Sequence, residues 1–82
     1  MKYRIDFKPR ALKDLKALPV AEHRRIIAKT EALQHGLAGD VKKLTNFTPE
    51  YRLRVGNYRV LFEVESSTVV VYRVLHRKDA YQ

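Results

Sequence analysis

The stretch YRLRVGNYR, residues 51–59, decides the fold of this chain. Apolar and cationic residues alternate over its first five positions, and such alternation places successive side chains on opposite faces of a β-strand. Gly56-Asn57 follows, a pair typical of the two-residue loop of a tight hairpin. This loop predicts a register in which Val55 lies opposite Tyr58 and Arg54 lies opposite Arg59.

Three arginines share one face of this predicted hairpin. Leu53 and Val55 point to one side, whereas Arg52, Arg54 and Arg59 point to the other. Like charges directly opposite one another on a sheet are unfavourable. The arginine face is therefore either open to solvent or built to hold an anion with several negative oxygens.

Upstream of the hairpin, the sequence predicts a strand and two helices. Residues 2–7 alternate and are typical of a strand. Pro9 suits the first position of a helix, and Pro19 ends that helix because the residue before a proline avoids the helical region. A second helix is expected over residues 20–35, with Gly36 as its C-terminal cap. The short connection at Pro19 predicts two adjacent antiparallel helices.

Downstream, residues 37–50 are expected to be a connection, and residues 58–65 and 69–77 two further strands. A two-residue turn at Ser66-Ser67 would turn Arg73 into the apolar side of the sheet, which costs several kcal/mol. We therefore predict a three-residue turn over residues 66–68, pairing Glu65 with Val69 and Phe62 with Tyr72. The residues then expected on the core side of the last strand are Val70, Tyr72 and Val74. Those expected on the arginine side of the sheet are Leu61, Val69, Val71, Arg73, Leu75 and Arg77.

These elements predict an α+β fold of a single domain, residues 1–82, in the order β-α-α-β-β-β. Two N-terminal antiparallel helices are expected on one face of a four-stranded, mainly antiparallel sheet. The 82 residues are 45% hydrophobic, which suits one modest core.

Charge and composition indicate the class of partner. Lys and Arg number 17 and Asp and Glu number 9, giving a formal net charge of +8. Such a balance favours an acidic partner, either nucleic acid or an acidic protein. The chain has no cysteine, which excludes disulfides and thiolate metal sites. Its N-terminus lacks the apolar core of a signal peptide and no run reaches membrane-spanning length, so we expect a cytoplasmic protein without a membrane partner.

Two motifs carry a resemblance to a known family. The hairpin YRLRVGNYRVLFEV, residues 51–64, precedes a valine-rich strand and the ending VLHRKDAY, residues 74–81. Together with the opening strand and the helix ALKDLKALP, residues 11–19, they resemble the RelE/ParE superfamily of bacterial and archaeal toxins. The resemblance covers essentially the whole chain, and its most specific parts are the Gly-x-Tyr-Arg hairpin and the His-Arg-Lys-Asp-Ala-Tyr ending.

The resemblance implies a toxin of a type II toxin–antitoxin system. RelE-like toxins are ribosome-dependent endoribonucleases that cut mRNA in the A site and so inhibit translation. ParE-like toxins share the fold, poison DNA gyrase and cleave no RNA. Both are neutralised by a cognate antitoxin in a complex that we expect to be oligomeric. We expect the RelE-type activity, with the ribosome and mRNA as further partners; a gyrase inhibitor and a basic binding module without activity are the alternatives.

The resemblance also implies a set of site residues. The cationic positions of the second strand, the arginine that opens the third, the arginine after the fourth and a late tyrosine fall on Arg52, Arg54, Arg59, Arg77 and Tyr81. The two second-strand positions are lysine in the best-known member and arginine here. This difference weakens any proposal that the second strand supplies the general base.

Cleavage without a metal uses the ribose 2′-hydroxyl as nucleophile on the adjacent phosphorus. It needs a proton acceptor, stabilisation of the charged phosphorane and a proton for the departing 5′-oxygen. The planar fork of arginine matches phosphate oxygens but is a poor base, because its pKa exceeds about 12. We therefore assign Arg59 and Arg77 to transition-state charge, and Arg52 and Arg54 to positioning the phosphate.

Three residues near the end of the chain are candidates for proton transfer: Tyr81, His76 and Lys78. A histidine titrates in the useful range, but the predicted register points His76 away from Arg77, which favours a structural role. Lys42, Lys43 and Lys78 are candidates for contacts to RNA, with a solvated pair as the alternative for Lys42 and Lys43. No spacing of His, Asp or Glu indicates a metal site, and no cofactor is expected.

Overall fold

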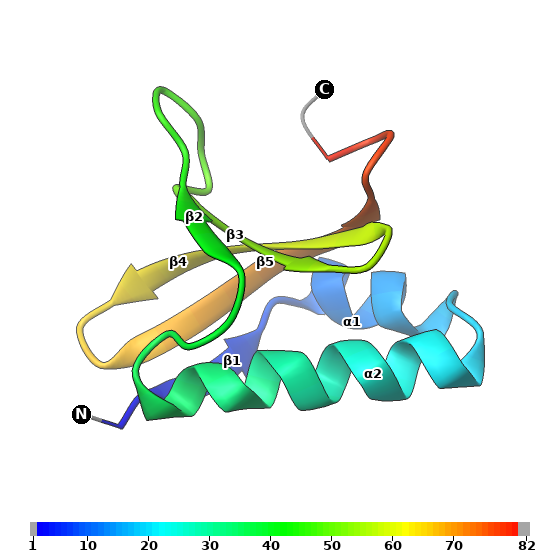
Figure 1. Cartoon of the computed structure of the whole chain (residues 1–82), viewed down its shortest axis with the longest axis horizontal. Coiled ribbons are helices and arrows are strands. Elements are labelled where there is room, and N and C mark those ends of the chain that lie inside the picture. Colours follow the sequence, from blue (N-terminus) through cyan, green and yellow to red (C-terminus); the bar gives the residue numbers. More distant parts are fainter. Residues whose placement is uncertain (1, 81–82) are drawn as a thin grey trace.

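The computed structural model describes residues 2–80, and its five strands form one sheet with both long helices on the same face (Figure 1). The strand order across the sheet is β1-β5-β4-β3-β2. The elements are β1 (Arg4–Phe7), α1 (Pro9–Lys16), α2 (Val20–Glu31), the 3-10 helix η1 (Ala32–His35), β2 (Val41–Lys43), β3 (Tyr51–Val55), β4 (Tyr58–Glu65) and β5 (Thr68–His76). The predicted α+β class is confirmed, and the sheet has one strand more than the four expected.

The additional strand, β2, lies within the segment that the sequence predicts to be a connection. It has only three residues and pairs antiparallel with β3, with Val41 opposite Leu53 and Lys42 opposite Arg52. A run this short carries almost no alternation, so its pairing depends on the neighbouring strand rather than on its own pattern.

The two helices form where prolines and a leucine stripe predict them. Pro9 opens α1, and the buried side chains of Ala11 and Leu15 face the sheet. Leu15 also connects α1 to α2, since its carbonyl oxygen lies 3.0 Å from Nδ1 of His23. Ile26 of α2 and Leu33 of η1 are fully buried and complete the helical side of the core.

Gly36 ends the second helical segment in a left-handed conformation, with φ 108° and ψ 33°. A Cβ at this position would meet no heavy atom within 4 Å, so backbone strain alone opposes a side chain here. Gly36→Ala is expected to lower the free energy of unfolding by about 1 kcal/mol, which corresponds to a fall in Tm of roughly 4–8 °C. Thermal unfolding followed by circular dichroism measures the change. Gly36→Asn should lose less, because asparagine tolerates this conformation, and equal losses would contradict the cause proposed.

The β3–β4 hairpin has the predicted register. Val55 pairs with Tyr58 and Arg54 pairs with Arg59 across the two-residue turn. Gly56 in that turn has φ 58°, a value that glycine adopts without strain. Leu53 and Val55 are buried in the core, which confirms the assignment of the two faces of β3.

The β4–β5 hairpin corrects the predicted three-residue turn. Glu65 pairs with Thr68, so the loop has two residues, Ser66 and Ser67. Phe62 pairs with Val71 rather than with Tyr72, and a β-bulge follows because Leu61 pairs with Arg73. Tyr72 is therefore the extra residue of the bulge, which shifts the alternation of β5 by one position.

The bulge resolves the difficulty that prompted the longer turn. Val69 and Val71 are fully buried before it and Val74 is buried after it, so Arg73 does not enter the core. The predicted core positions Val70 and Tyr72, and the predicted arginine-side positions Val69 and Val71, are thus wrong. Val74 is correctly placed, opposite Val60. The two-residue turn and the bulge together bury three valines of β5, whereas the predicted longer turn would have placed two on the core side, and they do so without burying a charge.

The first and last strands pair side by side. β1 is parallel to β5, with Arg4 opposite Thr68 and Phe7 opposite Val71, and the other strand pairs are antiparallel. The remaining length of β5 has no strand beside it at this edge, and α1 packs there instead (Figure 1).

Candidate nucleic-acid interface

The face of the sheet opposite α1 and α2, here called the open face, carries the predicted arginines. Two segments rise from this side, the connection between β2 and β3 and the turn that follows β5 (Figure 1). The pairing of β3, β4 and β5 places on it Arg52, Arg54, Arg59, Leu61 and Leu75. The face therefore has a cationic part and an apolar part.

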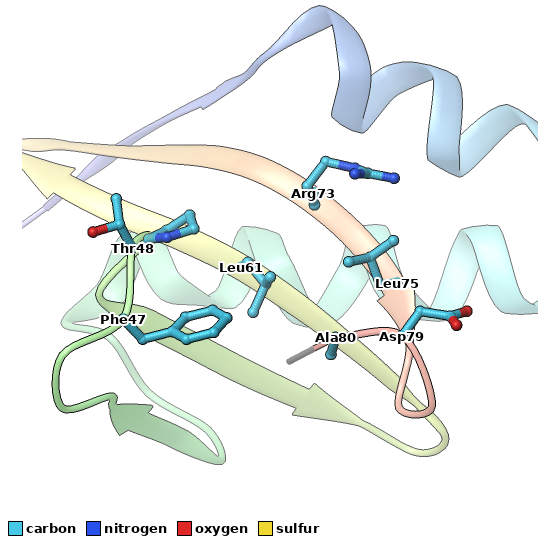
Figure 2. A pocket seen from close by; sticks show the side chains of 8 residues that line it. Phe47, Thr48, Leu61, Arg73, Leu75, Asp79 and Ala80 are labelled. Atoms are coloured by element: carbon cyan, nitrogen blue, oxygen red, sulfur yellow. The ribbon is translucent and has the colours of Figure 1, made fainter. Parts of the chain in front are cut away.

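A cavity of about 420 Å³ occupies the apolar part of the open face. Figure 2 shows Leu61 and Leu75 on its floor and Phe47 and Ala80 on its two sides. Its remaining lining residues are Thr48, Pro49, Arg73 and Asp79. Leu75 of β5 pairs with Arg59 of β4, and Leu61 lies two positions after Arg59 on β4. The two leucines of the cavity floor are therefore neighbours of Arg59 on the open face.

Arg52 and Arg54 converge on one carboxylate, that of Asp40. Nη1 of Arg52 donates to the Oδ1 of Asp40 at 3.2 Å and to its carbonyl oxygen at 3.0 Å, while Nε of Arg54 lies 3.9 Å from Oδ2. The Arg52 side chain is only 15% exposed, whereas that of Arg54 is 58% exposed. Asp40 thus fixes the first guanidinium firmly and leaves the second largely available.

Arg59 and Arg77 meet at the β3–β4 turn. Nη1 of Arg59 donates to the carbonyl oxygens of Gly56 and Tyr58, each at 3.0 Å. The backbone nitrogen of Arg77 donates to the carbonyl oxygen of Asn57 at 2.8 Å, and its side chain is exposed. The structure therefore brings Arg52 and Arg54 to one carboxylate and places the backbone of Arg77 at the turn that the Arg59 guanidinium contacts, with Arg54 directly opposite Arg59.

The three predicted lysines lie in different surroundings. Lys43 pairs with Tyr51, whose ring stacks on Phe62 of the core, so the register places Lys43 on the helix side of the sheet. Its Nζ is 3.6 Å from Oε2 of Glu50 and 6.0 Å from the centre of the Tyr51 ring. Lys42, which pairs with Arg52, is the lysine of β2 that belongs to the open face. Lys78 lies in the exposed turn after β5.

His76 takes part in structural contacts. Its ring meets that of Tyr58 edge-on, with centroids 5.5 Å apart, and its Nδ1 lies 3.2 Å from the backbone nitrogen of Lys78. These contacts favour the structural role that the predicted register suggested. Tyr81 lies outside the described residues.

Arg73, expected among the open arginines, pairs with Leu61 and lines the cavity of the open face, but its guanidinium is held by α1. Its Nε and Nη2 donate to the carboxylate of Asp14 at 2.8 and 3.1 Å, and Asp14 also accepts from the backbone nitrogen of Val74 at 3.0 Å. Burial raises the pKa of Asp14, but the hydrogen bonds from Arg73 and Val74 and the charges of Arg73 and Arg10 outweigh it and hold that pKa below its ordinary value. The same pairing raises the pKa of Arg73.

The sequence interpretation missed Asp40, Asp14 and Phe47. The only signal for Asp40 was an acidic residue beside a Val-Lys-Lys run, and it becomes meaningful only once that run is known to be a strand. Within residues 2–80 there is no group of three His, Asp or Glu residues that could hold a metal ion. Nor does this part of the chain contain a helix with the length and apolar character needed to span a bilayer.

Comparisons with known proteins match this architecture. Residues 5–81 fit the model of the family described as ParE toxin of the type II toxin–antitoxin system parDE. Toxin RelE3 of Methanocaldococcus jannaschii is 41% identical over 75 residues, covering 85% of each chain. A RelB–RelE antitoxin–toxin complex from Methanococcus jannaschii superposes with a TM-score of 0.75 at 39% identity, over 89% of this chain and 91% of that one.

A more distant structure, the toxin–antitoxin complex RelBE2 of Mycobacterium tuberculosis, has a TM-score of 0.81 at 27% identity and covers 94% of this chain and all of that one. The predicted resemblance is therefore confirmed. With its fold, its cationic open face and these relatives agreeing, the chain belongs to the RelE/ParE superfamily, as a type II toxin–antitoxin toxin of the RelE family.

Proposed function

We propose that this toxin is a metal-independent endoribonuclease that cleaves mRNA in the ribosomal A site and thereby inhibits translation. The observation that carries the proposal is the open face, where the register of β3, β4 and β5 places Arg52, Arg54 and Arg59 on the same side of the sheet as a cavity with an apolar floor. Phosphate oxygens suit the guanidinium groups, and a nucleobase suits an apolar floor. A cavity of about 420 Å³ has the size expected of a ligand site.

The arginines divide the chemistry between them. Arg52 and Arg54 position the phosphate. The hydrogen bonds to Asp40 fix the side chain of Arg52 before the substrate binds. Arg59 and Arg77 stabilise the charge of the phosphorane that forms when the 2′-oxygen attacks. Because arginine remains protonated, the proton acceptor is a different group, and Tyr81, His76 and Lys78 are the candidates.

The test uses purified toxin and ribosomes programmed with a defined message. Mapped 5′ ends within the A-site codon support the proposal. A message with a 2′-deoxy nucleotide at the cleaved position must remain intact, since it lacks the nucleophile. Uncut natural message at excess toxin would refute RNA cleavage. The pH dependence of the rate in Tyr81→Phe and His76→Ala then identifies the residue that transfers the proton.

A second candidate, inhibition of DNA gyrase, is favoured by the match of residues 5–81 to the ParE toxin model. Supercoiling of relaxed plasmid by purified gyrase tests it. Inhibition by the wild-type toxin without RNA cleavage would establish this second function, and full supercoiling at high toxin excess would eliminate it.

A cognate antitoxin is the proposed regulator, in an oligomeric complex. The solved structures that this chain resembles include RelB–RelE antitoxin–toxin complexes. The net charge of +8 and the apolar cavity together suit a partner segment with acidic and apolar residues. Its affinity for the toxin is therefore expected to fall as salt increases, and a salt-independent affinity would contradict this description.

Asp40 should limit the affinity of the open face for anions. Asp40→Asn removes a negative charge beside Arg52 and Arg54, and we expect it to tighten binding of a short single-stranded RNA about fivefold, equivalent to about 1 kcal/mol for a surface charge. Fluorescence anisotropy measures the affinity. Asp6→Asn, an exposed carboxylate on β1, is the charge-matched control. Equal changes in the two variants would show that net charge alone governs binding.

A further inference from the structure

Besides Arg59 and Arg77, the β3–β4 turn is in contact with an arginine of α2, Arg25. A Cβ added to Gly56 would lie 2.9 Å from Nη2 and 3.0 Å from Nη1 of Arg25, so the guanidinium of this α2 residue rests directly against the turn. The positive φ of Gly56 is one reason for a glycine at this position of the turn. The structure adds a second reason, because a side chain there would displace Arg25.

Cationic residues from three parts of the chain therefore contact two exposed residues, Arg25 and Arg59 through their guanidinium groups and Arg77 through its backbone. Arg59 of β4 donates to the carbonyl oxygen of Gly56, and Arg77, after β5, donates its backbone N–H to the carbonyl oxygen of Asn57. In Figure 1 the N-terminal half of α2, the β3–β4 turn and the segment after β5 all lie at one end of the molecule. We call Arg25, Arg59 and Arg77 the turn cluster.

The charge of Arg25 is only weakly compensated. Its Nη1 lies 4.0 Å from Oε1 of Glu22, at the outer limit of an ion pair, and the two side chains are 52% and 32% exposed. Exposed pairs of this kind contribute little and are easily exchanged for another anion. Asp40 and Asp14, by contrast, are engaged with other arginines.

The chemistry of the turn favours nucleic acid over a protein partner. Gly56 and Asn57, the two residues of the turn that the cluster contacts, are both exposed, and neither offers an apolar surface. A partner peptide gains most of its affinity from apolar anchors, whereas a nucleic-acid backbone needs repeated cations at the positions of its phosphates. The cluster also continues the open face, since Arg59 pairs with Arg54.

We propose that Arg25 and the β3–β4 turn form an RNA-backbone site that carries RNA from the open face past the ends of β3 and β4 onto α2. This inference rests on the proposed function, because it takes ribosome-bound RNA as the ligand. Arg25 binds phosphate there without taking part in the chemical step, so it is a binding residue and not a catalytic one.

The test compares Arg25→Ala with Arg24→Ala, a control that removes the same charge from the neighbouring exposed position of the same helix. Binding of each variant to 70S ribosomes carrying an uncleavable 2′-deoxy A-site codon is measured at several KCl concentrations. Arg25→Ala is expected to weaken binding about three- to tenfold and to reduce the slope of log Kd against log salt by about one. Arg24→Ala should stay within about twofold of wild type, and Arg25→Lys should recover most of the affinity.

Equal effects of the two alanine variants, or an Arg25→Ala affinity equal to that of wild type, would overturn the inference. Circular dichroism melts of each variant identify any loss of folding. Repeating the titration with vacant ribosomes distinguishes the source of the phosphates: a dependence on Arg25 that persists assigns them to ribosomal RNA, and one that disappears assigns them to the message. If Arg25→Ala weakens binding of an acidic antitoxin peptide more than it weakens binding of programmed or vacant ribosomes, the ligand of this site is a protein and not RNA.

Cleavage of natural message by the wild-type toxin is measured in parallel. If the wild-type toxin cleaves the message but Arg25→Ala binds ribosomes as Arg24→Ala does, the turn site is refuted and the proposed function stands. Binding that depends on Arg25 without any cleavage removes the endoribonuclease activity and leaves the turn site. The two proposals therefore fail separately.

Discussion

Arg77→Ala is expected to reduce the rate of A-site cleavage by about 10²- to 10³-fold, the loss typical when one group that stabilises transition-state charge is removed. The side chain of Arg77 is exposed, and its backbone N–H, which the substitution retains, makes the hydrogen bond to Asn57. The variant should therefore fold as the wild type does. Single-turnover cleavage on programmed ribosomes measures the chemical step apart from product release.

Arg4→Ala is the matched control for this variant. Arg4 is exposed on β1, at the edge of the sheet away from β3, so the substitution removes the same charge from a place distant in the strand order. Its cleavage rate should stay within a few-fold of wild type. An Arg77→Ala enzyme that cuts as fast as Arg4→Ala would remove Arg77 from the mechanism and would weaken the assignment of Arg59, its neighbour at the turn.

Asp14→Ala is expected to lower the free energy of unfolding by about 2–3 kcal/mol, a large part of the stability of a domain of this size. The Asp14 carboxylate accepts two hydrogen bonds from Arg73 and one from the backbone of Val74, and its side chain is 13% exposed. Its removal leaves a partly buried guanidinium and a strand N–H without these acceptors. Chemical denaturation by urea measures the loss, and Asp6→Ala, at an exposed carboxylate, should cost less than about 0.5 kcal/mol.

The same carboxylate predicts a pH dependence. The folded state holds the pKa of Asp14 below its value in the unfolded chain, about 3.9 for aspartate. Its contribution to stability is therefore present above about pH 4 and is lost as the pH falls through the lower, folded pKa. The difference in stability between wild type and Asp14→Ala should be largest at neutral pH and should shrink as the pH falls below about 4. A difference that is constant with pH would exclude the ionised carboxylate as its cause.

The parts of the fold that the sequence predicts well are those with local causes. The register of the β3–β4 hairpin follows from strict alternation and a Gly-Asn loop, both contained in nine residues. The helix limits follow from Pro9, Pro19 and Gly36, whose backbone preferences act locally. The bulge at Tyr72 has no such signal, because a two-residue turn followed by a bulge and a longer turn without one place Val74 opposite Val60 equally well.

Candidate site residues divide in the same way. The face on which Arg52, Arg54 and Arg59 lie was predictable from alternation, and the pairing of the strands confirms it. The partners of the arginines were not predictable, since Asp14 is 59 positions from Arg73 and only the packing of α1 on β5 joins them. The face occupied by Lys43 depends likewise on the register of β2, which three residues do not reveal.

The parallel pairing of β1 with β5 has a consequence for synthesis of the toxin. Arg4 of β1 pairs with Thr68 of β5, so β1 cannot pair until β5 has been synthesised. Contacts so distant along the chain form late in folding. A nascent copy therefore cannot complete its sheet before β5 has left the exit tunnel, and the open face, to which β5 contributes Leu75, is assembled only after that point.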